Sequence, residues 1–232
     1  MKPHIYGLTG RAGAGKDTAA DFLVPLHFRK LAFADSLRAE LSLALDVPIS
    51  VFTDRATKEC PHADLTLEKL PLHVWPAIAL ARTHESLDSN GGISLAWLAQ
   101  PRSPRQMMQW WGTEYRRRED PDYWVKSMKK KIDYHMQGGE RRFVVTDVRF
   151  ANEAAFVRSI GGEIWQLARP VTEEAPEGQH VSAVTGDDFE PEVVIPNDED
   201  VEALRGRVLA EYVSRDIWPH RDYVTVAIEV RS

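Results

Sequence analysis

Three glycines and a lysine near the start of the sequence have the spacing of a phosphate-binding loop. Residues 10–16 read GRAGAGK, which fits the first seven positions of the P-loop pattern. Glycines allow consecutive backbone N–H groups to turn toward one anion without a clash at Cβ. The helix expected next adds the N–H groups and the positive dipole end of its first turn. Together with the lysine, which can reach the β- and γ-phosphates, this predicts a nucleotide site made of Gly10, Arg11, Ala12, Gly13, Ala14, Gly15 and Lys16.

The two positions after the lysine depart from the most common form of this pattern. Asp17 stands where a Ser or Thr usually binds the metal ion, and Thr18 comes one residue later. The arrangement resembles the loop of adenylate kinases, where a Thr also follows the lysine by two positions, and this implies that Thr18 contacts phosphate. Asp17 could face Mg²⁺, directly or through water, or could be an acidic residue that stabilises the helix N-terminus. The sequence leaves both roles open.

The segments around the loop alternate between strands and helices, which is typical of an α/β domain. Short apolar runs predict strands at 4–9, 30–34, 142–147, 163–168 and 192–195, with a last edge strand at 223–230. Longer periodic segments predict helices at 16–26, from Asp35 or Ser36 to 45, from 103 through 111, from Asp120 or Asp122 to about 138, at 152–160 and at 198–213. This alternation predicts three layers, with a central, mostly parallel sheet between helices.

The length of the chain favours one domain, 1–232, that carries an insertion. Residues 46–140 contain several prolines and short helical segments, so we interpret them as an inserted, mainly helical region beside the sheet. Residues 171–191 have few periodic apolar positions and are expected to form a mobile loop, which could serve as a lid over a nucleotide.

Composition narrows the class of protein. Apolar residues make up 43% of the chain and charged residues 28%, as in an ordinary globular protein, and the net charge of −6 disfavours a large non-specific nucleic-acid surface. Cys60 is the only cysteine, so no intrachain disulfide can form and a reducing compartment is expected. The start of the sequence does not read as a signal peptide, and no apolar run is long enough to span a membrane. These features predict a soluble, cytoplasmic protein.

Two carboxylates follow predicted strands, at the sheet edge where open α/β folds bind ligands. Asp147 ends the strand at 142–147 and could hold Mg²⁺ through water, or could be a structural or capping acid. Arg149 could pair with Asp147 or with phosphate. Asp35 follows the strand at 30–34 and could orient the phosphate acceptor or accept its proton, or could cap a helix.

Several blocks, in order, resemble the bacteriophage deoxynucleoside monophosphate kinase family. They are residues 10–22, the central blocks 105–109, 112–114 and 123–126, the block 145–153 (VTDVRFANE), the run 161–170, and the later His180 and 195–198 (IPND). The resemblance implies a P-loop nucleotide kinase that uses ATP with Mg²⁺ and binds its acceptor in the inserted region. It also suggests a homodimer and, for a phage-encoded protein, a location in the host cytoplasm.

The resemblance and the chemistry together suggest further site residues. Arg105 lies at a helix start that suits the acceptor phosphate, and one residue of the basic run 116–118, which we take as Arg116, is expected to supply a cation for phosphoryl transfer. Trp111 could stack on a base, although two adjacent tryptophans on a helix are more often part of a core. The resemblance adds Gln109 and Glu114 to the acceptor site and places Asn197 at the adenine of ATP. Arg169, after the strand at 163–168, or Arg158 could be a lid arginine that contacts ATP.

Four functions remain open at this point. The first is transfer of the γ-phosphoryl group of ATP to a nucleoside monophosphate. The second is the same transfer to 5-hydroxymethyluracil in DNA, where the base would have to leave the stack. Dephospho-coenzyme A kinase shares the loop but fits residues 105–126 poorly. A regulator that binds nucleotide without catalysis is the fourth.

Overall fold

A computed structural model describes residues 3–170 and 188–217. The chain forms two compact units, one made of residues 1–30 and 141–232 and the other of 31–140. The predicted insertion, 46–140, lies wholly within the second unit. Most of the predicted lid, His180 and the predicted strand at 223–230 lie outside the described residues.

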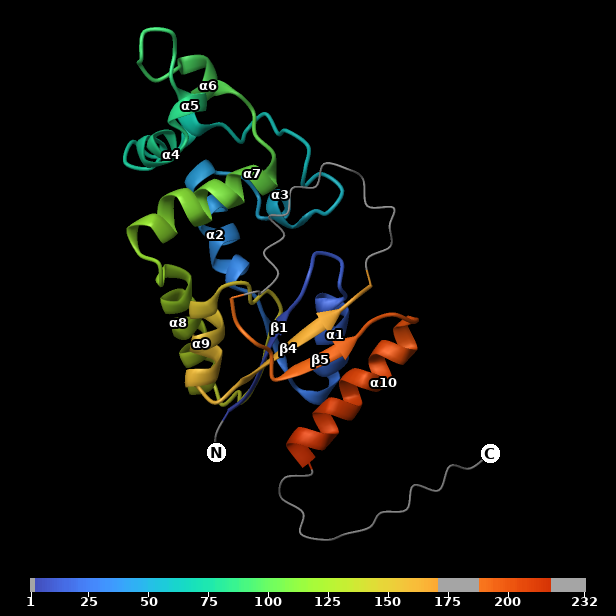
Figure 1. The fold of residues 1–232 in the computed structure, drawn as a ribbon. Coiled ribbons are helices and arrows are strands. Elements are labelled where there is room, and N and C mark those ends of the chain that lie inside the picture. Colours follow the sequence, from blue (N-terminus) through green and yellow to red (C-terminus); the bar gives the residue numbers. More distant parts are fainter. Residues whose placement is uncertain (1–2, 171–187, 218–232) are drawn as a thin grey trace. The chain divides into compact units, whose positions relative to one another are not determined.

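A five-stranded sheet is the centre of the first unit (Figure 1). Its order is β2-β3-β1-β4-β5, and the β1–β3, β1–β4 and β4–β5 pairs are parallel. The registers match Gly7 with Val145 and with Ile164. The strands are β1 His4–Thr9, β2 Arg29–Leu31, β3 Arg142–Val145, β4 Glu163–Ala168 and β5 Val193–Pro196.

Helices cover both faces of this sheet because successive strand side chains point to opposite sides. Tyr6 and Leu8 of β1 belong to a buried core shared with α1 (Lys16–Leu23) and α10 (Val201–Tyr212). A Cβ added at Gly7 would lie on the other face, 3.4 Å from Cγ1 of Val157 in α9 (Ala151–Ser159). The predicted three-layer α/β fold with a mostly parallel sheet is therefore confirmed.

The start of α2 (Phe33–Leu45) differs from the prediction. The strand expected at 30–34 ends at Leu31, and the helix N-cap is Ala32 rather than Asp35 or Ser36. Asp35 is the third helical residue, and its Oδ2 accepts a hydrogen bond of 2.9 Å from the N–H of Ala32. The carboxylate thus stabilises the first turn from the third helical position. The sequence alone did not distinguish this position from the N-cap, because acids are common at both.

The second unit is mainly helical, as expected, and its helices are short. Ser103 caps α7 by accepting from the N–H of Gln106, so the predicted Ser-Pro helix start is confirmed. The segment after α7 continues as a π-helix, η3, instead of an α-helix. The remaining elements are α3 Ser50–Thr53, η2 Leu67–Lys69, α4 Trp75–Ala81, α5 Thr83–Ser86, α6 Leu95–Ala99, α7 Pro104–Gln109, η3 Trp110–Arg117 and α8 Tyr123–Gln137, with η1 Val24–Leu26 and η4 Val213–Ile217 in the first unit.

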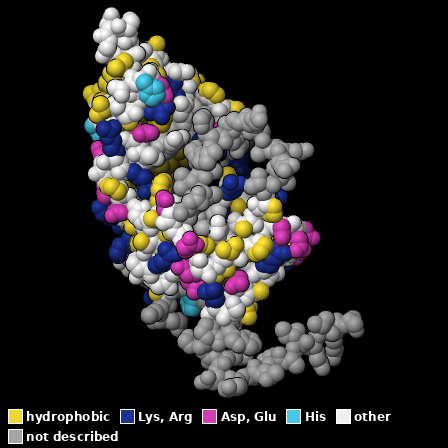
Figure 2. All heavy atoms as spheres, viewed as in Figure 1, with side chains coloured by type: hydrophobic (Ala, Val, Ile, Leu, Met, Phe, Trp, Pro, Cys, Tyr) yellow, Lys and Arg dark blue, Asp and Glu magenta, His cyan; other side chains and the backbone are white. Residues whose placement is uncertain are grey.

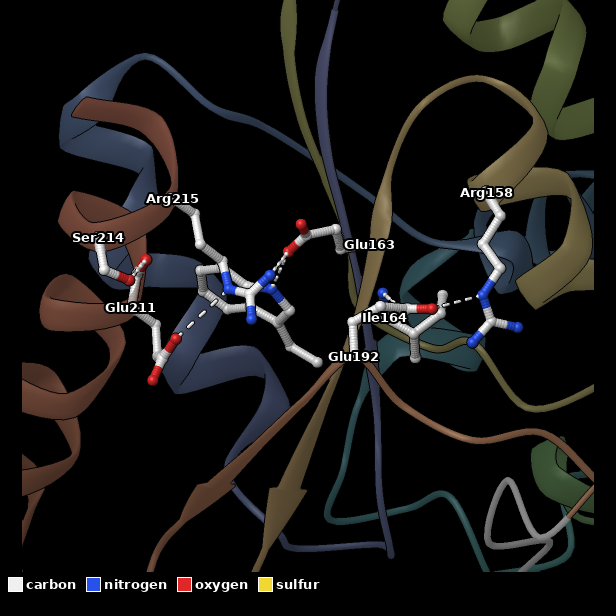
Figure 3. A network of polar contacts seen from close by, with 8 residues as sticks. Arg158, Glu163, Ile164, Glu192, Glu211, Ser214 and Arg215 are labelled. Atoms are coloured by element: carbon white, nitrogen blue, oxygen red, sulfur yellow. Dashed lines mark hydrogen bonds and ion pairs between the residues drawn. The ribbon is translucent and has the colours of Figure 1, made fainter. Parts of the chain in front are cut away.

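A network of charged side chains joins α9 and η4, the segment after α10, to the amino ends of β4 and β5 (Figure 3). Glu192 accepts from the N–H of Ile164 and from Nε of Arg158, at 2.6 and 2.7 Å. Glu163 accepts from Nη1 of Arg215 at 2.7 Å. This network lies at the strand ends opposite to the glycine-rich loop, so it holds the helices in place without occupying the edge where ligands bind.

The close packing between β1 and α9 gives a stability prediction. A Cβ added at Gly7 would lie 2.8 Å from Cδ1 of Ile164 and 2.9 Å from Cγ2 of Val148. We expect Gly7→Ala to lower the free energy of unfolding by about 1–3 kcal/mol, since packed cores resist extra volume.

Urea unfolding followed by circular dichroism measures this change. The matched control is Gly206→Ala in α10, where nothing in the described part of the chain lies within 4 Å of the added Cβ. That variant should be more stable by up to about 1 kcal/mol, because alanine is the better helix former. Equal stabilities of the two variants would contradict the packing argument.

Candidate functional site

The loop between β1 and α1 has backbone angles that suit the predicted phosphate-binding loop. Gly10 and Gly15 have φ angles of 126° and 93°, which other residues rarely adopt. Gly15 is the N-cap of α1, and no side chain caps that helix end. The N–H groups of the first turn are therefore not taken up by a side-chain cap, and the positive end of the helix dipole reinforces them.

Lys16 folds back over the loop. Its Nζ donates hydrogen bonds of 2.7 Å to the carbonyls of Gly10 and Arg11. Burial lowers the pKa of this amine, and the positive charge of Arg149 lowers it further, while Asp17 and Asp147 act in the opposite direction. The predicted site residues Lys16, Asp147 and Arg149 therefore lie within electrostatic reach of one another.

Two side chains from the strand ends hold the other side of the loop. Asn197, buried after β5, donates from Nδ2 to the carbonyl of Ala14 at 2.9 Å. Arg169, after β4, donates from Nη1 to the carbonyl of Gly13 at 3.3 Å. A Cβ at Gly15 would come within 2.6 Å of the Asn197 nitrogen, so a glycine is needed there for space as well as for backbone conformation. Both predicted ATP-site residues thus contact the P-loop backbone.

Asp17 takes part in an ion pair with the following strand. Nζ of Lys30 in β2 lies 3.1 Å from Oδ1 of Asp17 and 2.9 Å from Oδ1 of Asp21. The two carboxylates raise the pKa of Lys30, although burial acts against them. Because Lys30 is shared by two carboxylates, this pairing does not decide between the two roles left open for Asp17.

The turn after β3 is shaped by a buried acid. The carboxylate of Glu153, which is 2% exposed, accepts from the N–H groups of Arg149 at 2.8 Å and Phe150 at 3.3 Å. The N–H of Val148 donates to the carbonyl of Leu8 in β1. These bonds fix the backbone that carries Asp147 and Arg149 next to the strand that leads into the P-loop.

The remaining predicted residues belong to the second unit. Asp35 is half-buried and, besides its bond to Ala32, lies 3.3 Å from Nη1 of Arg38 and 3.4 Å from Nζ of Lys131. Arg105 is exposed and forms an ion pair with Glu59.

The predicted acceptor-site residues on α7 and η3 differ in their exposure. Gln109 is exposed and Glu114 is half-buried. Trp111 is only 4% exposed, so its ring has no open face for a base; the interpretation of this pair of tryptophans as core agrees with the structure. Arg116 is half-buried and forms an ion pair with Glu40 at 2.9 Å.

Comparison with known proteins decides the family. The family model described as "Deoxynucleotide monophosphate kinase" matches residues 87–208, just over half of the chain. The chain belongs to the deoxynucleotide monophosphate kinase family. The match begins well after the P-loop, so the loop geometry and the family match are separate observations that agree. The protein is thus a nucleotide kinase.

A protein of Acanthamoeba polyphaga mimivirus, "Putative deoxynucleotide monophosphate kinase", is 26% identical over 221 residues, which cover 89% of this kinase and 94% of that protein. Among solved structures, a dephospho-CoA kinase from Campylobacter jejuni has 11% identity and a TM-score of 0.48, covering 92% and 97% of the two chains. A sugar kinase from Janibacter sp. has 14% identity and a TM-score of 0.41, covering 90% and 94%.

The kinase has a donor set that fits Mg²⁺ bound together with nucleotide phosphates. Mg²⁺ in such sites takes one or two carboxylates, and its other ligands are phosphate oxygens and water. Asp147 lies at the carboxyl end of β3, half-buried and within electrostatic reach of Lys16. In the part of the chain that the structure describes, no three His, Cys, Asp or Glu side chains gather as a self-sufficient metal site. Residues 3–170 and 188–217 also contain no helix suited to crossing a membrane.

Several residues that contact the predicted site residues were missed in the sequence. Lys30, Glu40 and Glu153 act through partners that are distant in sequence or through backbone groups. Arg38 instead pairs with Asp35, three positions earlier in α2. For Glu153 a signal existed, because an acid at the third position of a helix often bonds back to the N-cap. A local signal also existed for Arg38, because Asp35 and Arg38 have the i,i+3 spacing of a helical ion pair. Nothing local marks Lys30 and Glu40.

The bond from Asn197 to the P-loop gives the prediction for this site. Asn197→Asp exchanges the amide donor for an acceptor and adds negative charge beside the predicted phosphate-binding loop. We expect the Kd for ATP to rise about tenfold or more, because a buried carbonyl loses its partner. Titration calorimetry with a non-hydrolysable ATP analogue measures this change, with the exposed loop variant Asn90→Asp as control. An unchanged Kd would show that the bond does not shape the loop.

Proposed function

We propose that this kinase transfers the γ-phosphoryl group of ATP to a deoxynucleoside monophosphate and releases the diphosphate. The observation that carries the proposal is the glycine-rich loop between β1 and α1, where no side chain caps α1 and the Lys16 ammonium lies against the carbonyls of Gly10 and Arg11. Family membership supports a nucleotide acceptor.

The residues of the first unit would bind and activate ATP. The loop N–H groups and Lys16 would hold the β- and γ-phosphates and offset the charge that develops during transfer. Asp147 would hold Mg²⁺, which neutralises phosphate charge when bound, and Thr18 would contact phosphate. Arg149, exposed beside this group, would reach the transferred phosphoryl group. Arg169 and Asn197 would act through the loop carbonyls that they bind.

The acceptor would be bound by residues of the second unit. Arg116 offers a guanidinium that is fixed on one side by Glu40. Asp35, held between Arg38 and Lys131, would orient the acceptor, with Arg105, Gln109 and Glu114 as further contacts. Little proton abstraction is needed early in a loose phosphoryl-transfer transition state, so Asp35→Asn should lower kcat only modestly.

An acceptor panel tests the proposal directly. The enzyme is incubated with ATP and Mg²⁺ and, separately, with dGMP, dTMP, dCMP, dAMP, 5-hydroxymethyl-dUMP, the ribonucleotides, and DNA that contains 5-hydroxymethyluracil. We expect rapid formation of one or more deoxynucleoside diphosphates. Phosphorylation of the modified DNA alone would replace the proposed acceptor. On the described part of the face shown in Figure 2, Lys and Arg side chains are interspersed with Asp and Glu.

Lys16 gives the second test. Lys16→Ala removes the cation that follows the transferred phosphoryl group, so kcat/KM for ATP should fall by about 10²–10³-fold or more. The control is Lys129→Ala, an exposed lysine of α8 paired with Asp133. Near-normal turnover by Lys16→Ala, measured as ADP release, would contradict the P-loop assignment.

A further inference from the structure

Glu40 of α2 is the centre of a polar cluster that also includes side chains of η3 and α8. Its Oε2 accepts from Nε1 of Trp111 and from Nε of Arg116, both at 2.9 Å. Its Oε1 accepts from the hydroxyl of Tyr123 at 2.6 Å. All these side chains belong to the second unit, and the carboxylate itself is only about a quarter exposed.

The π-helix is the reason that Trp111 and Arg116 reach the same oxygen. These residues are five positions apart in η3. In an α-helix, side chains at that spacing point about 140° apart. Hydrogen bonds of a π-helix join residues five apart, which brings the two side chains onto one face. π-helical turns are rare and are often found at functional sites, so this one invites a functional explanation.

Arg116 is held on its faces as well as at one edge. Its guanidinium lies 4.7 Å from the ring centroid of Tyr115 and 4.5 Å from that of Tyr123. Nη1 also donates to the hydroxyl of Tyr115 at 3.1 Å. Burial lowers the pKa of Arg116, but the hydrogen bond to Glu40 and the nearby negative charge outweigh it, so the pKa is raised. Nε and Nη1 are the nitrogens with partners among the described residues, which leaves the Nη2 edge for an anion.

We propose that Glu40 is a positioning residue, which holds the Arg116 guanidinium so that its remaining edge binds the phosphate of the acceptor nucleotide. This inference rests on the proposed function. A bound guanidinium keeps one geometry, and an arginine whose rotamer is already fixed loses less entropy when it binds phosphate. Glu40 contributes through Arg116 and does not touch the substrate.

The alternative is that Glu40 only joins three helices. Two variants separate the roles. Glu40→Gln keeps an oxygen for Trp111 and Arg116 and a group that can bond Tyr123, but it removes the charge. Arg116→Met keeps the apolar stem and removes the guanidinium. The matched control is Glu85→Gln, which weakens another Glu–Arg pair of the same unit, that with Arg82.

The experiment measures kcat and both KM values for wild type, the two single variants and the double variant, with thermal unfolding of each. We expect Glu40→Gln to raise the KM of the acceptor roughly three- to tenfold and Arg116→Met roughly ten- to hundredfold, with the KM of ATP nearly unchanged. In the Arg116→Met background, Glu40→Gln should add no further effect, because it acts through that arginine.

Equal effects of Glu40→Gln in the presence and absence of Arg116 would overturn the inference, as would a lower melting temperature with an unchanged acceptor KM. A wild-type enzyme without activity on any monophosphate would instead refute the proposed function. The two failures are therefore distinguishable.

Discussion

The direction in which the P-loop carbonyl groups point is the constraint on which the candidate site depends. A loop that binds an anion must direct its N–H groups at the ligand, and each carbonyl that points the same way would repel the phosphate. Here the carbonyls of Gly10 and Arg11 accept from Lys16, that of Gly13 accepts from Arg169 and that of Ala14 accepts from Asn197. Donors from three separate segments thus determine the direction of one short loop.

The parallel sheet brings those donors together. Because β1, β4 and β5 run in one direction, the residues that follow them lie at one edge, and Asn197 is near the P-loop although the two are far apart in sequence. The charged network of Glu163, Glu192 and Arg215 occupies the opposite edge. The division leaves one end of the sheet for stability and the other for phosphate chemistry, so that a mutation at one end need not disturb the other.

Local features were predictable, and features that join distant segments were not. The P-loop and the Ser103 cap depend on neighbouring residues, and the sequence predicted both. Asp35 was assigned to the wrong helical position because caps and third-position acids use the same residue types. The pairing of Glu40 with Arg116 depends on the π-helical conformation of η3. The residue types of this short segment do not distinguish a π-helix from an α-helix, so the sequence predicted only a helix.

Because residues 110–117 form a π-helix, the Glu40 cluster depends on the number of residues in this segment as well as on their side chains. Deleting a single residue there would allow the segment to close into an α-helix and would turn Trp111 and Arg116 to different sides. Relatives that keep every residue of the cluster but lack that one extra position would lose the shared hold on Glu40. In an alignment, a one-residue gap would then matter more than many substitutions.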